Sequence, residues 1–314
     1  MSVSAAAPTR PPEGLDRTGL IAALICYVIW GTFPLLFHQM GVRGASAWEI
    51  VGWRTVFAVP VSLALVLLTR GTGHVAAVLA QPRQLALLAL SATLIATNWT
   101  VYVWAVGAGQ TLAASLGYYI NPLVNAAVGA LFFREKINRW GVVALTLATI
   151  GVLAQAVALG APPWVALVLA GSFAGYGAVR KQSKADAQGG LLIECLILSP
   201  FAVGLLVWLA QHGSLKFGQG IDITLLLLTC GPVTVAPLAL FAFAARRLPF
   251  NVVGFIQFIT PTLQFACGLW QGERLTWQSL VSFAFIWAGA LVFAVNLVAR
   301  LRRESAAGSP ADAS

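Results

Sequence analysis

The sequence predicts an all-α integral membrane protein with ten transmembrane helices, and three observations lead to this prediction. Hydrophobic residues make up 59% of the 314-residue chain and charged residues only 9%, and the mean hydropathy is +0.84. Soluble proteins contain far more charged residues than this. The apolar residues form ten runs that approach the length needed to cross a bilayer, and features of the first five runs return in the last five.

Polar tails enclose the apolar runs. We assign residues 1–17 to an N-terminal tail and residues 300–314 to a C-terminal tail. The first tail lacks the ordered charged, apolar and cleavable segments of a signal peptide, so we expect no removable signal there. The predicted helices lie at residues 18–38, 48–69, 84–106, 112–133, 140–159, 162–180, 189–210, 222–244, 250–271 and 277–299.

The fourth run, LAASLGYYINPLVNAAVGALFF at residues 112–133, is uncharged but has two different faces. On a helical wheel one face is apolar, and the other carries groups that lipid cannot satisfy. That polar stripe therefore requires protein or water beside it. Its members are Ser115, Tyr118, Pro122, Asn125 and Gly129, with Asn121 next to them.

A similar stripe recurs in the ninth run, about 139 residues later, and this recurrence indicates a duplication. Its members are Gly254, Gln257, Pro261, Gln264 and Gly268. We therefore divide the chain into two five-helix repeats, residues 18–159 and 162–299. Because each repeat has an odd number of spans, the second must enter the membrane inverted. Inverted repeats are typical of alternating-access carriers, whose solute site lies near the midplane between the repeats.

Basic residues collect in alternate loops, and this bias sets the orientation of the chain. The opposite loops hold only Arg43, Lys216 and Arg274. Both termini are therefore predicted to be cytoplasmic. The cytoplasmic loops and tails hold Arg10, Arg17, Arg70, Arg83, Arg134, Lys136, Arg139, Arg180, Lys181, Lys184, Arg246, Arg247, Arg300, Arg302 and Arg303.

Two charged residues, Arg54 and Glu194, lie within apolar runs, where a charge costs about 2.5–3.5 kcal/mol on insertion scales. The planar guanidinium of Arg54 suits a carboxylate or phosphate on a solute. Glu194 can gain and lose a proton, so we predict it to be a proton-coupling group. The alternatives are snorkelling for Arg54 and an interfacial or packing role for Glu194. Since inverted repeats place them at mirrored depths, we do not expect them to form a direct salt bridge.

A wider set of polar residues is predicted to line the solute site, because amides and hydroxyls both donate and accept hydrogen bonds. Interhelical hydrogen bonding is the alternative role for each of them. We expect Pro122 and Pro261 to kink their helices beside the stripes. Trp30, Trp99, Trp104, Tyr118 and Tyr119 can stack on a flat or cationic solute. The solute-binding candidates are Arg54, Asn98, Tyr102, Tyr118, Asn121, Asn125, Gln257, Thr260 and Gln264.

Other functions find less support in the sequence. No nucleophile–base set, metal motif or P-loop occurs, so we predict no enzyme activity, no metal and no cofactor. The net charge of +9 is explained by topology rather than by nucleic acid, and the isolated Cys26, Cys195, Cys230 and Cys267 are expected to be buried apolar residues. A channel or a non-transporting structural or signalling protein remains an alternative, and a homodimer remains open.

Several segments together resemble the EamA-type drug/metabolite transporter superfamily, and specifically its RarD branch of chloramphenicol-sensitivity permeases. They are YVIWGTFPLLF, EIVGWR, NWTVYVWAV, SLGYYINPLVN, AARRLPFNVVGFIQFITPTLQF and FAFIWAGALVF, and the resemblance covers about residues 18–298. It implies a bacterial inner-membrane secondary transporter (permease) for small organic solutes, metabolites or drugs such as chloramphenicol-type compounds. Relatives typically carry His-Arg where this chain has Trp53-Arg54, so no role for that histidine transfers.

Overall fold

The structure, a computed structural model, describes residues 16–133, 139–159, 161–245, 247–248 and 256–307. Within these residues the regular structure is α-helical, with no strand. Seven helical spans in the described part are long and apolar enough to cross a membrane, and a shorter apolar helix, Trp164–Arg180, accompanies them. The protein is therefore an α-helical membrane protein, as predicted, while the count of ten spans stays a prediction.

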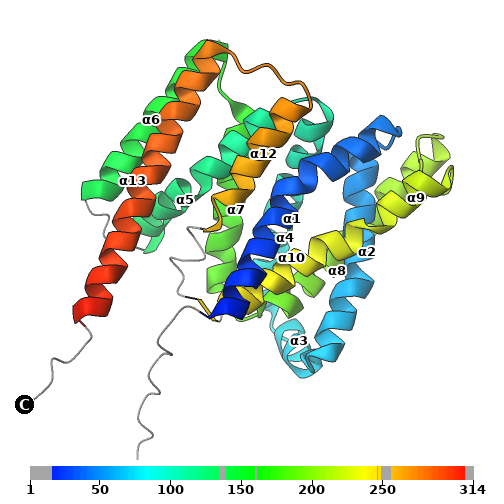
Figure 1. Cartoon of the computed structure of the whole chain (residues 1–314). Helices are drawn as coiled ribbons and strands as arrows, with labels where there is room; N and C mark the ends of the chain where they lie inside the picture. The colour runs from blue at the N-terminus through cyan, green and yellow to red at the C-terminus, as the bar shows by residue number, and fades with distance from the viewer. Residues whose placement is uncertain (1–15, 134–138, 160, 246, 249–255, 308–314) are drawn as a thin grey trace, which may run out of the picture.

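The helices follow the predicted runs closely (Figure 1). In chain order they are α1 (Arg17–Val42), α2 (Ala47–Leu68), α3 (Thr72–Leu79), α4 (Pro82–Gly107), α5 (Thr111–Phe133), α6 (Arg139–Leu159), α7 (Trp164–Gln182), α8 (Ala187–Gln211), α9 (Ile221–Leu228), α10 (Cys230–Ala245), α12 (Ile259–Trp270) and α13 (Trp277–Ala307).

Local sequence signals fix where several helices begin. The Asp16 carboxylate accepts hydrogen bonds from the first free amides of α1, and Ser46 and Asp186 cap α2 and α8 in the same way. Pro82 stands in the first turn of α4, where a missing N–H costs nothing.

Three features differ from the predicted runs. The short helix α3 lies between the second and third runs, where a loop was expected. The eighth run is divided at Thr229 into α9 and α10. Pro232 accounts for the division, since it cannot donate to the carbonyl four residues earlier. The helix α12 begins at Ile259, within the predicted run 250–271, and residues 249–255 of that run lie outside the described residues.

The most extensive helix contacts between the two halves of the chain recur when the halves are exchanged. α1 packs on α10 and on α12, just as α7 packs on α4 and on α5. α10 packs on α2, and α4 packs on α8. The remaining close pairs, α2 with α8, α5 with α12 and α6 with α13, each join helices of the same rank, and α6 and α13 run side by side in Figure 1.

Glycines allow the closest of these helix contacts. A Cβ atom at Gly117 of α5 would lie 2.9 Å from the carbonyl oxygen of Ala166 on α7. A Cβ atom at Gly31 of α1 would lie 2.7 Å from the side chain of Leu263 on α12. Small residues at such crossings let membrane helices approach backbone to backbone. These contacts hold α1, α5, α7 and α12 together around the polar stripes.

Candidate functional site

Arg54 lies in α2 at a point where helices from both halves of the chain meet. Its side chain is buried, with 5% of its surface exposed. Nε donates a hydrogen bond of 2.9 Å to Thr234 Oγ1 on α10. The guanidinium carbon lies 4.3 Å from the ring centre of Trp99 on α4, and 5.5 and 5.7 Å from the rings of Phe33 and Phe37 on α1. The guanidinium is therefore enclosed by aromatic faces, and snorkelling to the interface is not observed.

These neighbours do not neutralise the charge of Arg54. The ion pairs formed by the described residues join Arg43 to Asp222, Arg180 to Glu194 and Arg247 to Asp16, and none includes Arg54. A desolvated cation–π contact is worth about 2 kcal/mol. Burying an ion costs several kcal/mol, so the rings offset only part of that cost.

Next to this cage, Tyr102, Tyr118 and Asn98 form a polar group between α4, α5 and α7. Tyr118 Oη donates to Asn98 Oδ1 at 3.0 Å, and Asn98 Nδ2 donates to the Leu169 carbonyl at 3.0 Å. The Tyr102 ring lies 5.5 Å from the Tyr118 ring and 6.0 Å from the Phe37 ring. The Tyr102 hydroxyl is buried and has no partner among the described residues. Asn98 thus holds helices together, whereas the Tyr102 hydroxyl remains available.

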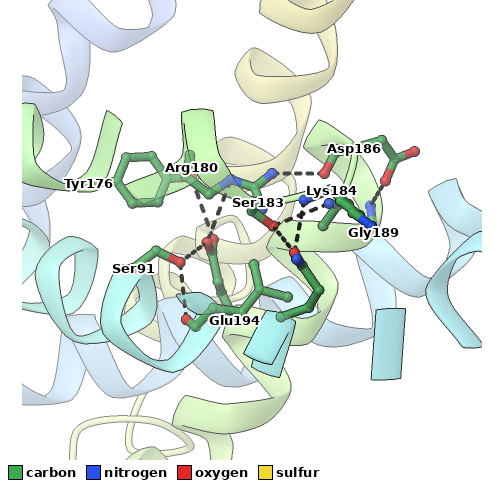
Figure 2. A network of polar contacts seen from close by, with 11 residues as sticks. Ser91, Tyr176, Arg180, Ser183, Lys184, Asp186, Gly189 and Glu194 are labelled. Atoms are coloured by element: carbon green, nitrogen blue, oxygen red, sulfur yellow. Dashed lines mark hydrogen bonds and ion pairs between the residues drawn. The ribbon is translucent and has the colours of Figure 1, made fainter. Parts of the chain in front are cut away.

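The second buried charge, Glu194 on α8, is surrounded by partners (Figure 2). Its carboxylate accepts hydrogen bonds from Ser91 Oγ on α4 at 2.5 Å and from Tyr176 Oη on α7 at 3.4 Å. Arg180 Nε, near the end of α7, lies 3.7 Å from Glu194 Oε1. Arg54 and Glu194 therefore have different partners, as expected from their predicted depths.

Arg180 reaches Glu194 because the start of α8 leaves room for it. A Cβ atom at Gly190 would collide with the Arg180 guanidinium. Arg180 Nη2 donates to the Asp186 carbonyl at 2.7 Å, which ties the guanidinium to the turn between α7 and α8. The sequence places Arg180 among the loop cations that set topology, and no local spacing signals its pairing with Glu194.

On α12, two predicted site residues bind backbone carbonyls of α1. Thr260 Oγ1 donates to the Tyr27 carbonyl at 2.9 Å, and Gln264 Nε2 donates to the Trp30 carbonyl at 3.2 Å. Pro34 leaves that second carbonyl without its usual intrahelical donor, so Gln264 takes the place of the missing N–H. Gln264 Oε1 is buried and has no partner among the described residues.

The remaining predicted residues are placed as follows. Asn121 is fully buried, and both atoms of its amide lack a partner among the described residues. Gln257 is partly buried in the turn before α12. Pro261 lies in the first turn of α12 rather than inside a longer described helix, where a kink was expected. The side chains of Asn125 and Pro122, both on α5, lie outside the described residues.

The structure describes only part of the region between the two polar stripes, because the side chain of Asn125 lies outside the described residues. α5 and α12 do pack together, but their hydroxyl contact joins Tyr119 Oη to Thr262 Oγ1 at 2.7 Å. Tyr118 turns instead toward α4, and Gln264 toward α1. Ser115 bonds the Leu112 carbonyl within its own helix. The structure thus brings Arg54, Tyr102, Tyr118 and Asn98 close together, while Thr260 and Gln264 contact α1.

Two further carboxylates, those of Glu49 and Glu273, connect the two halves of the chain near the starts of α2 and α5. The sequence places both at loop edges. Glu49 is buried and accepts from the amides of Lys216 and Phe217 at 2.9 and 2.8 Å. Glu273 accepts from the amides of Thr111 and Leu112. Ser46-x-x-Glu49 is a capping-box spacing, yet the Glu49 carboxylate crosses to the other half.

A groove of about 460 Å³ opens on the outer face of α4 and α8. Two of its three threonines, Thr93 and Thr97, donate to carbonyls of their own helix. None of the predicted site residues lines it. It is lined by Thr93, Ala96, Thr97, Thr100, Val101, Leu198 and Phe201.

A family model and several relatives place this chain in one family, and a solved structure shares its fold. The EamA-like transporter family matches residues 17–155. An "Uncharacterized transporter" of Vibrio cholerae is 39% identical over 91% of this chain and 95% of its own, and "Protein RarD" of Escherichia coli is 38% identical over 92% and 98%. "Chloramphenicol-sensitive protein RarD" of Pseudomonas aeruginosa is 29% identical over 94% and 99%. A crystal structure at 17% identity shares the fold, with a TM-score of 0.58 over 88% of this chain and 96% of that one.

Proposed function

Because this chain belongs to the EamA-like transporter family, in its RarD branch, we propose that it is a secondary carrier that moves small organic solutes by alternating access. The relatives are named as transporters and not as enzymes, and they come from bacteria. The protein is accordingly a multi-pass membrane transporter of the drug/metabolite type, and its setting is the bacterial inner membrane. The solute, the mechanism and the topology below are our proposals.

The proposed topology has ten spans in two inverted repeats, residues 18–159 and 162–299, with both tails in the cytoplasm. The most extensive helix contacts between the halves support it, since each of these has a counterpart on exchange of the halves or joins helices of equal rank. Reporter fusions at Arg10 and Arg303 should both read as cytoplasmic. One fusion inside and the other outside would rule out an inverted arrangement.

The observation that carries the proposal is the buried charge of Arg54, which lacks a counter-charge among the described residues. α1, α2 and α4 of the first half and α10 of the second half all contribute to its surroundings. A buried charge inside a membrane protein marks a solute or ion pathway by default. Its position at the meeting point of the halves is where an alternating-access carrier exposes its solute to each side in turn.

We propose that the solute contacts the groups whose polar atoms are not committed to the fold. Tyr102 Oη, Gln264 Oε1 and the Asn121 amide are such groups. Tyr118, which bonds Asn98, packs against the Tyr102 ring and positions it, and Thr260 fixes α12 against α1. Asn125 and Gln257 complete the proposed set from the polar stripes of the sequence. We assign Pro122 to kinking α5 and Pro261 to shaping the start of α12 beside this set.

Glu194 is our proposed proton-coupling group. To take up a proton, its carboxylate must give up its charge interaction with Arg180, and this would loosen α7 from α8. A proton would thereby favour one arrangement of the bundle over another. The coupling thus acts through the packing of helices rather than through contact with the solute.

Transport by protein reconstituted in liposomes tests the carrier proposal. The solutes to try are chloramphenicol, since one relative is named for sensitivity to it, and small organic anions such as benzoate. Saturable uptake of at least one of them is expected, and Gln264→Leu and Asn125→Leu should abolish it. Gln81→Leu, at the exposed start of α4, is a matched control that should transport normally. Flux that rises linearly with concentration would indicate a channel instead.

A further inference from the structure

We propose that Arg54 binds the single negative charge of a monoanionic organic solute, a carboxylate carried on a planar apolar body. This rests on the proposed carrier function and names its substrate class. Three observations lead to it: the charge count around Arg54, the free ends of its guanidinium, and the composition of the surrounding cage.

All six acidic residues whose side chains the structure describes are engaged elsewhere. Glu194 is held by Arg180, and Asp222 by Arg43. Glu49 and Glu273 accept backbone amides across the halves. The other two cap helices, Asp16 at α1, where it also pairs with Arg247, and Asp186 at α8. Within the described residues, the charge of Arg54 therefore has no acidic partner in the fold.

The guanidinium is bound by the described residues at one nitrogen only. Thr234 accepts from Nε, and no described residue accepts a hydrogen bond from the two terminal nitrogens. A carboxylate can accept from both of these nitrogens at once, in the bidentate geometry that arginine favours. The Tyr102 hydroxyl, whose ring shares Phe37 with Arg54, is an additional buried donor without a partner. A neutral solute would leave the charge uncompensated.

The residues around Arg54 determine which net charge and which kind of organic group the solute can carry. One cation neutralises one anion, whereas a phosphate monoester carries close to two charges at neutral pH. The second charge would then be buried among aromatic rings, at a cost of several kcal/mol. The rings of Phe33, Phe37, Trp99 and Tyr102 surround the site, and they favour a flat, apolar body beside the carboxylate.

Thermal unfolding of the purified full-length protein with four probes tests this inference. Benzoate should raise the apparent melting temperature, because a ligand that binds only the folded state stabilises it. Benzamide has nearly the same shape and no charge, and phenyl phosphate has too much charge, so both should leave the melting temperature unchanged. Stabilisation by chloride to the same extent would assign the site to an inorganic anion and overturn the organic part of the proposal.

Variants of Arg54 complete the test. Arg54→Gln should weaken benzoate binding roughly 10- to 100-fold, as expected for a lost hydrogen bond to a charged group. Arg54→Lys keeps the charge but not the planar fork, so it should bind with intermediate affinity, and it serves if Arg54→Gln does not fold. Arg43→Gln removes a cation from a surface pair and should respond like the unmodified protein.

Equal benzoate responses of the unmodified protein and an Arg54 variant would overturn the inference, and so would an absent response in the unmodified protein. Stabilisation by phosphatidylglycerol vesicles but not by benzoate would assign the charge to a lipid headgroup and also overturn it. A different result would contradict the proposed carrier function alone. Benzoate binding would still depend on Arg54, but no solute would cross reconstituted liposomes.

Discussion

The two buried charges, Arg54 on α2 and Glu194 on α8, each precede a proline of their helix, Pro60 and Pro200, but they have opposite surroundings. Glu194 receives a countercharge from Arg180 and two hydroxyl donors, all from the protein itself. Arg54 receives one hydroxyl and three aromatic faces. The charge of Glu194 is neutralised within the fold, whereas we propose that the charge of Arg54 is neutralised by a bound solute. This difference supports our proposal that Arg54 serves recognition, whereas the pairing of Glu194 stabilises the helix packing.

The two charged residues also differ in how much they contribute to the packing of the helices around them. Arg180 and Glu194 join the end of α7 to the start of α8, and Ser91 brings in α4. Removing a partner there should disturb the packing of three helices. Around Arg54 the helices are joined by apolar and aromatic contacts that do not depend on the charge. Stability measurements should therefore respond strongly at Glu194 and weakly at Arg54.

The largest effect is expected for Glu194→Ala, which leaves the Arg180 guanidinium without its countercharge. Breaking a buried pair in this way typically costs 3–5 kcal/mol, and we expect about 3 kcal/mol because Arg180 retains some access to water. Equilibrium unfolding of the protein in detergent measures the loss. Asp222→Ala, which breaks the exposed pair with Arg43, is the matched control and should have little effect.

A double variant sharpens this result. Glu194→Gln with Arg180→Gln removes both charges, so it should lose less stability than the sum of the two single changes. Strict additivity would mean that the two side chains do not interact, and the contrast with Arg54 would then fail.

The next largest effect is expected on the transport activity of the Glu194→Gln variant. This substitution keeps the shape of the side chain but removes its ability to gain and lose a proton. A difference of one pH unit is worth about 1.4 kcal/mol and supports about tenfold accumulation of a solute that moves with one proton. The variant should exchange solute across liposomes but lose this accumulation. Gradient-driven uptake at the level of the unmodified protein would remove Glu194 from the coupling mechanism.

The sequence predicts the helices well because hydropathy and length decide which segments cross a membrane. Nine of the predicted runs begin within a few residues of the observed helices, and the start of the remaining run, 250–271, lies outside the described residues. The split at Thr229 was not anticipated, although Pro232 supplies its cause. Periodicity also located the polar stripes, because a helix brings residues three and four apart onto one face.

The partners of the buried charges could not be predicted in the same way. Arg180 meets Glu194 only because the turn into α8 and the missing side chain of Gly190 allow it. Trp99 reaches Arg54 from another helix, 45 residues later in the chain. Contacts of this kind depend on how helices cross, and a single sequence carries no periodic signal for them. The pairing of Gln264 with a carbonyl freed by Pro34 belongs to the same class.

A smaller effect, and of opposite sign, is expected at Asn121. Its amide is fully buried and has no partner among the described residues, so it should destabilise the empty protein. Asn121→Leu is nearly isosteric and should raise the free energy of unfolding by about 1–2 kcal/mol while weakening solute binding. Equilibrium unfolding and a binding titration measure the two effects. A loss of stability would mean that the amide holds the fold together, as Asn98 does.

The smallest change in stability is expected for Arg54→Gln in the absence of solute. The substitution removes the cation–π contacts, worth about 2 kcal/mol, but it also removes a buried charge whose desolvation opposes folding. These contributions have opposite signs, so the free energy of unfolding should change by less than about 1 kcal/mol, in either direction. The glutamine can still bond Thr234, which keeps that hydroxyl satisfied.

Equilibrium unfolding in detergent without added carboxylate measures the effect of Arg54→Gln, and Glu194→Gln under the same conditions provides the comparison. A loss at Arg54 as large as the loss at Glu194→Ala would show that the fold depends on both charges equally, and Arg54 would then be a structural residue rather than one reserved for a solute.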